Sequence, residues 1–172
     1  MTNVIKDLIR DIPDFPKPGI IFKDITPLLV NGQAFHRAVD LIAAHYRDTP
    51  IDQIVCVEAR GFIMGAPLAY KLGAGLVPVR KPGKLPAETI QTTYELEYGT
   101  DTLEIHADAI PEGGNVLIAD DLLATGGTVA GVVKLLGQLK ANIVGVAFLI
   151  ELEFLKGRDK LKGFDIFSLI RY

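Results

Sequence analysis

The chain has 172 residues, of which 49% are hydrophobic and 23% are charged, and its formal net charge is −3. This composition is typical of a folded globular protein with one domain over residues 1–172, and no apolar run reaches the roughly 18 residues of a membrane span. The small negative charge argues against a dedicated nucleic-acid-binding protein, which would present a basic face, but not against a small phosphorylated ligand.

The first part of the chain predicts a helix, a loop and a second helix. Apolar residues have helical spacing over residues 4–12 and stop at Pro13. Residues 14–29, DFPKPGIIFKDITPLL, contain three prolines and are expected to be irregular, but an apolar loop of this length commonly covers a site. Asn31 has the character of an N-cap for a helix with an apolar face over residues 35–46.

From residue 53 onward, strands and helices alternate. Apolar runs predict strands at 53–59, 75–80, 115–119 and 142–152, helical spacing predicts helices at 60–73 and 129–140, and the tail FDIFSLIRY predicts an edge strand. Residues 88–107 show strand-like alternation on both sides of a turn, which indicates a β-hairpin or long flap. This order is typical of an α/β fold with a central, mainly parallel sheet flanked by helices.

The single cysteine, Cys56, lies within the first of these strands and is expected to be a core residue. One cysteine forms no internal disulfide, and the N-terminus has no basic segment followed by an apolar stretch. We therefore expect a protein of the reducing cytoplasm.

Residues 116–131, VLIADDLLATGGTVAG, contain the most informative turn. A buried strand leads to Asp120 and Asp121 and then to a Thr-Gly-Gly-Thr turn at 125–128. Glycines and a helix N-terminus present backbone N–H groups to a phosphate, and the carboxylates would then accept hydrogen bonds from an attached ribose. The alternative is an ordinary helix start, with Thr128 as its cap and the aspartates favoured by the helix dipole. Neither a Walker loop nor a G-x-G-x-x-G motif is present.

Three further segments are candidates, each with a plainer alternative. Arg60 in EARG (58–61) would clamp an oxyanion, or is an exposed arginine at a helix start. The basic segment RKPGK (80–84) would bind an anion, or is simply solvated. Glu97 and Tyr98 in YELEYG would close over a substrate and transfer a proton, or form a solvated hairpin tip. The three histidines lack metal-ligand spacing.

These segments, in this order, resemble the phosphoribosyltransferase family, and in particular its adenine-using members. The resemblance covers residues 10–155 approximately, and it departs from the family pattern at Lys23, where some members have Arg, and at Ala119, which replaces a larger aliphatic residue. It implies a type I phosphoribosyltransferase fold with an N-terminal base-binding hood within residues 1–30 and a flexible loop or flap over 81–107. It also implies the purine-salvage reaction in which adenine and 5-phosphoribosyl-1-pyrophosphate give AMP and pyrophosphate in the presence of Mg²⁺.

The resemblance further implies a role for each candidate residue. The 5-phosphate would be held by Ala124, Thr125, Gly126, Gly127 and Thr128, and the ribose hydroxyls by Asp120 and Asp121. Pyrophosphate would be bound by Arg60, Arg80, Lys81 and Lys84, and the base by the hood around Ile21, Phe22 and Lys23. Glu97, Tyr98 and Arg60 would be the catalytic groups, and Mg²⁺ would enter with the substrate, with no protein ligand assigned.

A homodimer is expected, since in the family the basic loop reaches the site of the neighbouring subunit. Neither a nucleic acid nor a membrane is expected as a partner. Two other functions stay open. One is transfer to hypoxanthine, guanine or xanthine, and the other is a regulator that binds the ribosyl phosphate without catalysis.

Overall fold

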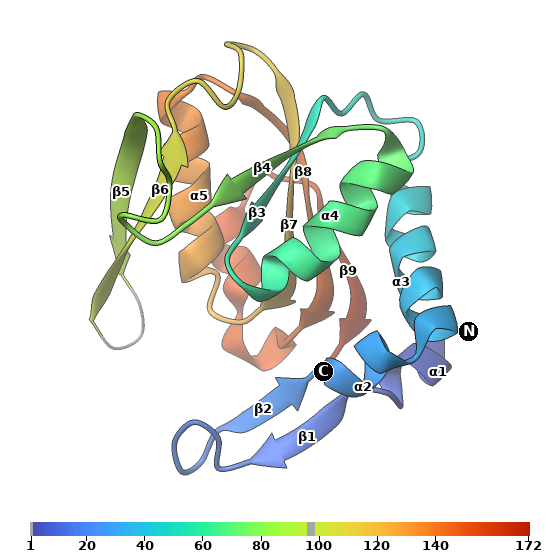
Figure 1. Ribbon diagram of the computed structural model, residues 1–172. Coiled ribbons are helices and arrows are strands. Elements are labelled where there is room, and N and C mark those ends of the chain that lie inside the picture. Colours follow the sequence, from blue (N-terminus) through green and yellow to red (C-terminus); the bar gives the residue numbers. More distant parts are fainter. Residues whose placement is uncertain (1, 96–98) are drawn as a thin grey trace.

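The computed structural model describes residues 2–95 and 99–172. Its centre is a five-stranded parallel sheet in the order β4-β3-β7-β8-β9. The strands are β3 (Gln53–Val57), β4 (Gly75–Val79), β7 (Asn115–Leu123), β8 (Asn142–Glu151) and β9 (Ile166–Arg171). Helices α3 (Gly32–His45) and α4 (Arg60–Leu72) cover one face, and α5 (Gly127–Gln138) covers the other (Figure 1). The predicted parallel sheet flanked by helices is confirmed.

Alternate residues of the central strands pack into two separate cores, one on each face of the sheet. Along β7, Leu117 and Ala119 belong to the α3–α4 core, whereas Val116 and Ile118 belong to the α5 core. All four side chains are at most 1% exposed. Burial on both faces explains why this strand is a continuous apolar run rather than an alternation of apolar and polar residues.

The N-terminal region differs from its prediction. The prediction of a helix over residues 4–12 is wrong beyond Lys6. Helix α1 covers only Thr2–Lys6, and Arg10–Pro13 forms strand β1. β1 pairs with β2 (Ile21–Asp24) in an antiparallel hairpin. Pairing between residues that are distant in sequence thus overrides the local helical spacing.

The stretch 14–29, expected to be irregular, contains β2 and most of α2 (Thr26–Val30). Its turn uses positive φ angles at Asp14 and Gly19, and the Gly19 N–H donates to the Asp14 carboxylate. The β1–β2 hairpin projects from the body of the molecule beside the ends of β8 and β9 (Figure 1). This is the edge of the sheet at which ligands of open α/β folds bind.

Several other predicted elements are confirmed. Asn31 caps α3 through its side-chain oxygen, and α4 ends at Gly73, whose φ of 69° is left-handed. The hairpin over 88–107 forms as β5 (Thr89–Glu95) and β6 (Thr100–His106), and the tail forms the edge strand β9. Within the described ranges, no helix has the length and apolar character needed to cross a membrane.

Two features of the C-terminal half were not expected. β7 continues beyond its predicted end at Ala119 to Leu123, so that Asp120 and Asp121 lie inside the strand. After β8 the chain forms two 3-10 turns, η1 (Glu153–Leu155) and η2 (Gly157–Leu161). Both turns follow the carboxyl end of β8, and η2 lies next to the start of α5.

Candidate active site

The predicted segments 58–61 and 120–128 lie close together because β3 and β7 are neighbouring parallel strands. Cys56 of β3 is level with Ala119 of β7, so the residues that follow each strand lie side by side. Arg60, the first residue of α4, places its Nε 2.9 Å from Oδ2 of Asp121. The angles of this ion pair are not those of a hydrogen bond, and both Arg60 Nη1 and Asp121 Oδ2 are buried without a hydrogen-bond partner among the described residues. The site therefore contains buried polar atoms that the protein itself does not satisfy.

Beside the buried Asp121 lies Asp120, which is half-buried. Its Oδ1 accepts a hydrogen bond from the Asp121 N–H at 2.9 Å. An added Cβ on Gly61 would lie 2.8 Å from this oxygen, so the carboxylate packs against the backbone of α4 and a larger residue at position 61 would displace it. Burial and the nearby Asp121 charge raise the pKa of Asp120 well above its usual value. Burial also raises the pKa of Asp121, against the opposing effect of Arg60.

The Gly-Thr turn forms a small cradle, which we define as residues 122–129. These residues line a cavity of about 60 Å³ at the start of α5. The N-cap of α5 is Gly126, with a left-handed φ of 77°, so the alternative in which Thr128 caps the helix is wrong. An added Cβ on Gly126 would lie 2.5 Å from the Gly157 carbonyl oxygen. Conformation and packing thus both require glycine here.

The hood meets this site through Phe22. The Arg60 guanidinium carbon lies 4.8 Å from the centre of the Phe22 ring, which also contacts the Phe15 ring edge-on at 5.1 Å. The Lys23 side chain points elsewhere: its Nζ lies 2.7 Å from Asp11 Oδ1 and 3.7 Å from the centre of the Tyr172 ring. Of the predicted base-binding residues, the structure therefore brings Phe22 to the Arg60–Asp121 pair and directs the Lys23 ammonium away from it.

A largely apolar pocket of about 390 Å³ lies between the hood and the η1 turn. Its lining residues are Gly19, Ile20, Ile21, Lys23, Leu152, Phe154, Leu155 and Tyr172. The contribution from residues 152–155 was not predicted from the sequence. Its signal was the apolar pair Phe154–Leu155, which comes shortly after the end of a buried strand.

Two cations of the basic segment 80–84 are already paired within the chain. The Arg80 Nε donates to Glu58 at 2.7 Å, the Lys81 N–H donates to the same carboxylate at 3.0 Å, and the Lys81 ammonium pairs with Asp101. Burial opposes ionisation of Glu58, but the hydrogen bonds from Arg80 and Lys81 outweigh it and lower its pKa. Lys84 is exposed. The conformation of this segment is thus fixed by hydrogen bonds and ion pairs, and its charges are not simply solvated.

Glu104 of β6 is a second carboxylate that holds this loop, and the sequence did not predict it. Its side chain is 2% exposed. One oxygen accepts from the N–H groups of Lys84 and Leu85 at 3.2 and 3.3 Å, and the other accepts from Thr89 and Gln91 at 3.3 and 3.1 Å. Burial raises its pKa, but these four donors outweigh burial and lower it. Glu104 therefore joins the basic segment to the flap.

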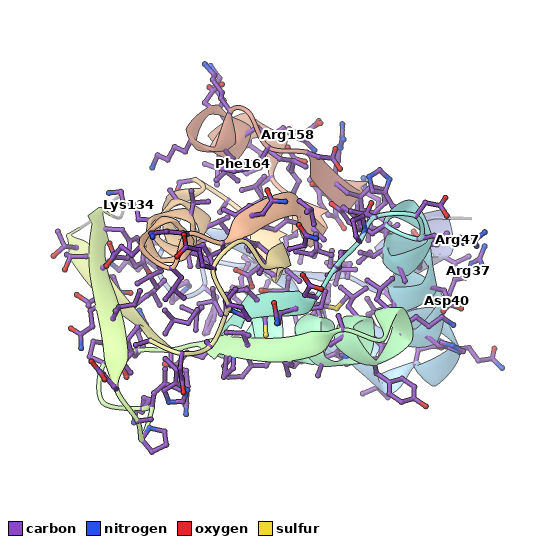
Figure 2. All side chains as sticks on the ribbon, turned by 90° about the horizontal axis from the view of Figure 1, so that it is seen from above. Arg37, Asp40, Arg47, Lys134, Arg158 and Phe164 are labelled. Carbon is purple, nitrogen blue, oxygen red and sulfur yellow. The ribbon has the colours of Figure 1, made fainter. Side chains whose placement is uncertain are left out.

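Glu97 and Tyr98, the predicted catalytic pair, lie outside the described residues. The hairpin on either side of them rests on α5 through Tyr94, since an added Cβ on Gly131 would lie 2.9 Å from the Tyr94 ring. The Tyr94 hydroxyl also donates to Asp101 at 3.2 Å. A cavity of about 490 Å³ separates the hairpin from α5 and is lined in part by Lys134, which is labelled in Figure 2.

The carboxylates of the site do not form a complete metal-binding cage. No group of three or more His, Cys, Asp or Glu side chains suited to a metal ion occurs within residues 2–95 and 99–172. Asp120 and Asp121 nevertheless provide two adjacent carboxylates beside the cradle. Such a pair fits a hard cation that keeps most of its ligands from substrate phosphates and water.

Known proteins resemble this chain along almost its whole length. The family model of the phosphoribosyl transferase domain matches residues 28–165. An adenine phosphoribosyltransferase of Syntrophotalea carbinolica is 64% identical over 98% of this chain and 98% of its own. The crystal structure of adenine phosphoribosyltransferase from Thermoanaerobacter pseudethanolicus superposes with a TM-score of 0.98 at 56% identity, covering 100% of both chains. That from Saccharomyces cerevisiae, complexed with an imino-altritol bisphosphate and adenine, has a TM-score of 0.92 at 44% identity, covering 98% and 97%.

Proposed function

The chain belongs to the phosphoribosyltransferase family, and we propose how the residues of its site divide the transfer of a phosphoribosyl group to adenine. The activity is that of an adenine phosphoribosyltransferase in purine salvage, which converts adenine and 5-phosphoribosyl-1-pyrophosphate into AMP and pyrophosphate. The observation that carries the assignment of roles is the meeting of Arg60, Asp120, Asp121 and the cradle at one edge of the sheet.

The cradle and the two aspartates bind the ribose 5-phosphate half of the donor. Backbone N–H groups at the start of α5 and the hydroxyls of Thr125 and Thr128 donate hydrogen bonds to the phosphate. The positive end of the helix dipole favours the negative charge of the phosphate. Asp120 and Asp121 accept hydrogen bonds from the ribose hydroxyls. Asp121 Oδ2 supports this role: it lies 2.9 Å from Arg60 Nε but accepts no hydrogen bond from the described residues, and a ligand hydroxyl would donate to it.

Arg60 and the basic segment act on the leaving group. The adenine N9–C1′ bond forms as the C1′–O bond breaks, so positive charge develops on the sugar and negative charge on pyrophosphate. Arg60, whose Nη1 has no partner within the described chain, donates to the developing pyrophosphate. Lys84 and, after exchange of their present partners, Arg80 and Lys81 add positive charge to the same group.

Mg²⁺ fits this site as a cation brought by the donor. Asp120 and Asp121 lie where they would approach such a cation, either directly or through its water ligands. When bound, it supplies positive charge that neutralises the departing pyrophosphate.

The flap that carries Glu97 and Tyr98 closes over the donor and keeps water from the reactive C1′ centre. Glu97 takes part in moving the N9 proton of adenine. Replacing Glu97 by alanine lowers kcat by about 10²-fold or more, the size of a lost general acid–base group, with little change in donor affinity. Single-turnover kinetics check this role, and an unchanged kcat would reduce Glu97 to a surface residue.

The hood selects the base through backbone groups of β2 and by stacking on Phe22. Adenine has a donor at its exocyclic amine and an acceptor beside it, which match one backbone C=O and one N–H. A 6-oxopurine would leave both groups mispaired, and such mispairing discriminates by about 10⁴-fold or more. The Lys23 side chain takes no direct part, in accord with its bonds to Asp11 and Tyr172.

The enzyme works as a homodimer through α4 and β4. Tyr70 on α4 is 90% exposed, and Ile63 and Leu76 are exposed on the same helix and on β4. β4 is an edge strand of the central sheet, so this apolar surface is available to a second copy. Equilibrium sedimentation tests the dimer, and an active monomer would refute a site shared between subunits. The buried thiol of Cys56 suits a cytoplasmic enzyme.

A purine panel tests the function directly. The purified protein is incubated with the ribosyl donor, Mg²⁺ and adenine, hypoxanthine, guanine or xanthine in turn. AMP formed from adenine, with the other bases slower by about 10⁴-fold, is the expected result. Faster turnover of a 6-oxopurine would assign a different base. Donor binding without turnover of any purine would indicate a regulator instead.

A further inference from the structure

Beneath the cradle, the backbone of the η2 turn forms a floor. An added Cβ on Gly157 would collide with the Ala124 carbonyl oxygen and would lie 2.8 Å from Leu123 Cδ1 and 3.1 Å from the Gly126 nitrogen. The reverse is also true, since an added Cβ on Gly126 would meet the Gly157 carbonyl. The two glycines thus pack backbone against backbone, and the shape of the cradle depends on where η2 lies.

The position of η2 is determined by the next residue, Arg158. Its guanidinium forms two hydrogen bonds with Glu151, Nε to Oε1 at 2.6 Å and Nη2 to Oε2 at 2.7 Å. Nη1 donates to the Ile166 carbonyl at 3.2 Å, and Nη2 lies 3.4 Å from the Ser168 hydroxyl. Arg158 therefore ties the turn to the end of β8 and to β9, and it lies between these elements in Figure 2.

Glu151 connects this clamp to the strand that leads into the cradle. It is the last residue of β8, is 3% exposed, and is paired in register with Leu123 of β7. The Leu152 N–H donates to the Leu123 carbonyl at 2.9 Å, immediately before the cradle turns. Hydrogen bonds to Arg158 and Ser168 lower the pKa of Glu151 despite its burial, so the pair stays ionised.

In the described part of the chain, neither charged side chain lines the cradle, whose cavity is lined by residues 122–129. The positive charge of Arg158 is matched by Glu151, and its donors are directed to β8 and β9 rather than to the cavity. Arg158 is therefore not arranged as a phosphate ligand. What the pair does provide is a rigid, planar, bidentate joint that holds Gly157 in place.

We infer that the Glu151–Arg158 pair is a positioning device for phosphate binding, which acts on the cradle through the backbone of Gly157. The inference rests on the proposed role of the cradle as the 5-phosphate site. When this ion pair is weakened, Gly157 can move, and the N–H groups of the cradle no longer all point at the phosphate. Affinity for the ribosyl phosphate then falls, whereas affinity for the base, which does not contact the cradle, is unchanged.

The test measures ribose 5-phosphate binding by calorimetry and the KM values of both substrates for Arg158→Gln, Arg158→Lys and Gly157→Ala. Ribose 5-phosphate binding weakens about tenfold in Arg158→Gln and more in Gly157→Ala, as expected when a binding group is displaced by a fraction of an ångström. Arg158→Lys, which keeps the charge but loses the bidentate fork, gives an intermediate loss and remains informative if the glutamine variant does not fold. The KM for adenine stays within about twofold in every folded variant.

Arg171→Gln is the matched control, since Arg171 also approaches Glu151, at 3.7 Å, but does not belong to the η2 turn. It leaves ribose 5-phosphate binding within about twofold of wild type. Unchanged binding in folded Arg158→Lys, or an equal rise in both KM values, overturns the inference and leaves the pair a purely structural one. A wild-type protein that does not bind ribose 5-phosphate overturns the proposed cradle itself, and the inference with it.

Discussion

The site contains two pairs of acidic residues, Asp120 with Asp121 and Glu58 with Glu104, which differ in how well hydrogen bonds stabilise their charge. Asp120 and Asp121, beside the cradle, have pKa values raised by burial, and Asp121 Oδ2 is buried with no hydrogen-bond donor in the described ranges. Glu58 and Glu104, beside the basic segment, have lowered pKa values because several donors converge on each carboxylate. The first pair has the character expected of the ligand-binding groups we propose, whereas the second pair holds a loop in place. The state of a buried carboxylate, satisfied or not, thus separates binding groups from scaffold in one site.

The difference has an energetic side. A carboxylate whose pKa is raised in the folded state opposes folding above its unfolded pKa, because its charge is better solvated in the unfolded chain. A carboxylate whose pKa is lowered in the folded state favours folding in the same pH range. The end of the site that contains Asp120 and Asp121 therefore lowers the stability of the fold, whereas the end that contains Glu58 and Glu104 raises it.

Asp120→Asn removes one charge from the ligand-binding pair and has the greatest effect of the variants considered. We expect kcat/KM for the ribosyl donor to fall by about 10³-fold, the size of a lost charge-stabilising contact in a closed site. The melting temperature should rise by about 2 °C or more at neutral pH, because an amide is buried in place of a carboxylate. The asparagine oxygen still accepts from the Asp121 N–H. Steady-state kinetics and calorimetry check both effects, and a fall in Tm would contradict the role given to Asp120.

Glu104→Gln tests the scaffold pair. In this variant the NH₂ group of the glutamine replaces one of the two acceptor oxygens of Glu104. The hydrogen bonds from Lys84 and Leu85, or those from Thr89 and Gln91, are therefore lost. We expect a lower Tm and a KM for pyrophosphate that rises by about threefold to tenfold in the reverse reaction. Thr102→Ala, which removes one exposed hydrogen bond to Thr93 between the strands of the same hairpin, is the control. A Glu104→Gln enzyme with normal Tm would mean that the segment is held by Glu58 alone.

The pH dependence of stability provides a more direct test of the opposite signs. At low pH the relevant carboxyls are protonated in both states, so each variant should melt close to wild type. As pH rises towards about 4, the unfolded-state value for these groups, wild type should become more stable than Glu104→Gln, and this difference should then stay constant. Only as pH rises above about 4 should wild type become less stable than Asp120→Asn. Differential scanning calorimetry from acid to neutral pH measures both differences. If both variants differed from wild-type Tm in the same direction at neutral pH, the distinction between the two pairs would be refuted.

Lys23→Ala should have the smallest functional effect. The ammonium is held by Asp11 and Tyr172, away from the Arg60–Phe22 contact. The KM for adenine should therefore stay within about twofold, with a loss of stability of about 1 kcal/mol from the ion pair and the ring contact. Phe22→Ala is the positive control, and its KM for adenine should rise by about tenfold because a stacking surface is lost. A Lys23→Ala variant as impaired as Phe22→Ala would place the ammonium on the base.

Local patterns predicted much of this protein. Apolar runs and helical spacing identified the strands of the parallel sheet, the helices between them and the cap at Asn31, because these signals arise within a few neighbouring residues. The same holds for the Gly-Thr turn, whose left-handed Gly126 and following helix are properties of one short segment. The resemblance to phosphoribosyltransferases rests on several such segments in a particular order.

Only the tertiary structure decided which distant residues meet. The sequence around residues 10–13 has helical spacing, but these residues are a strand because residues 21–24 pair with them. Glu104 reads as one polar residue in an alternating strand, yet it is buried where the basic segment folds back on it. Gly157 and Arg158 carry no motif, and their link to the cradle exists because β8 returns beside β7. Periodicity records which face of an element is buried, whereas the identity of the partner depends on packing across the whole chain.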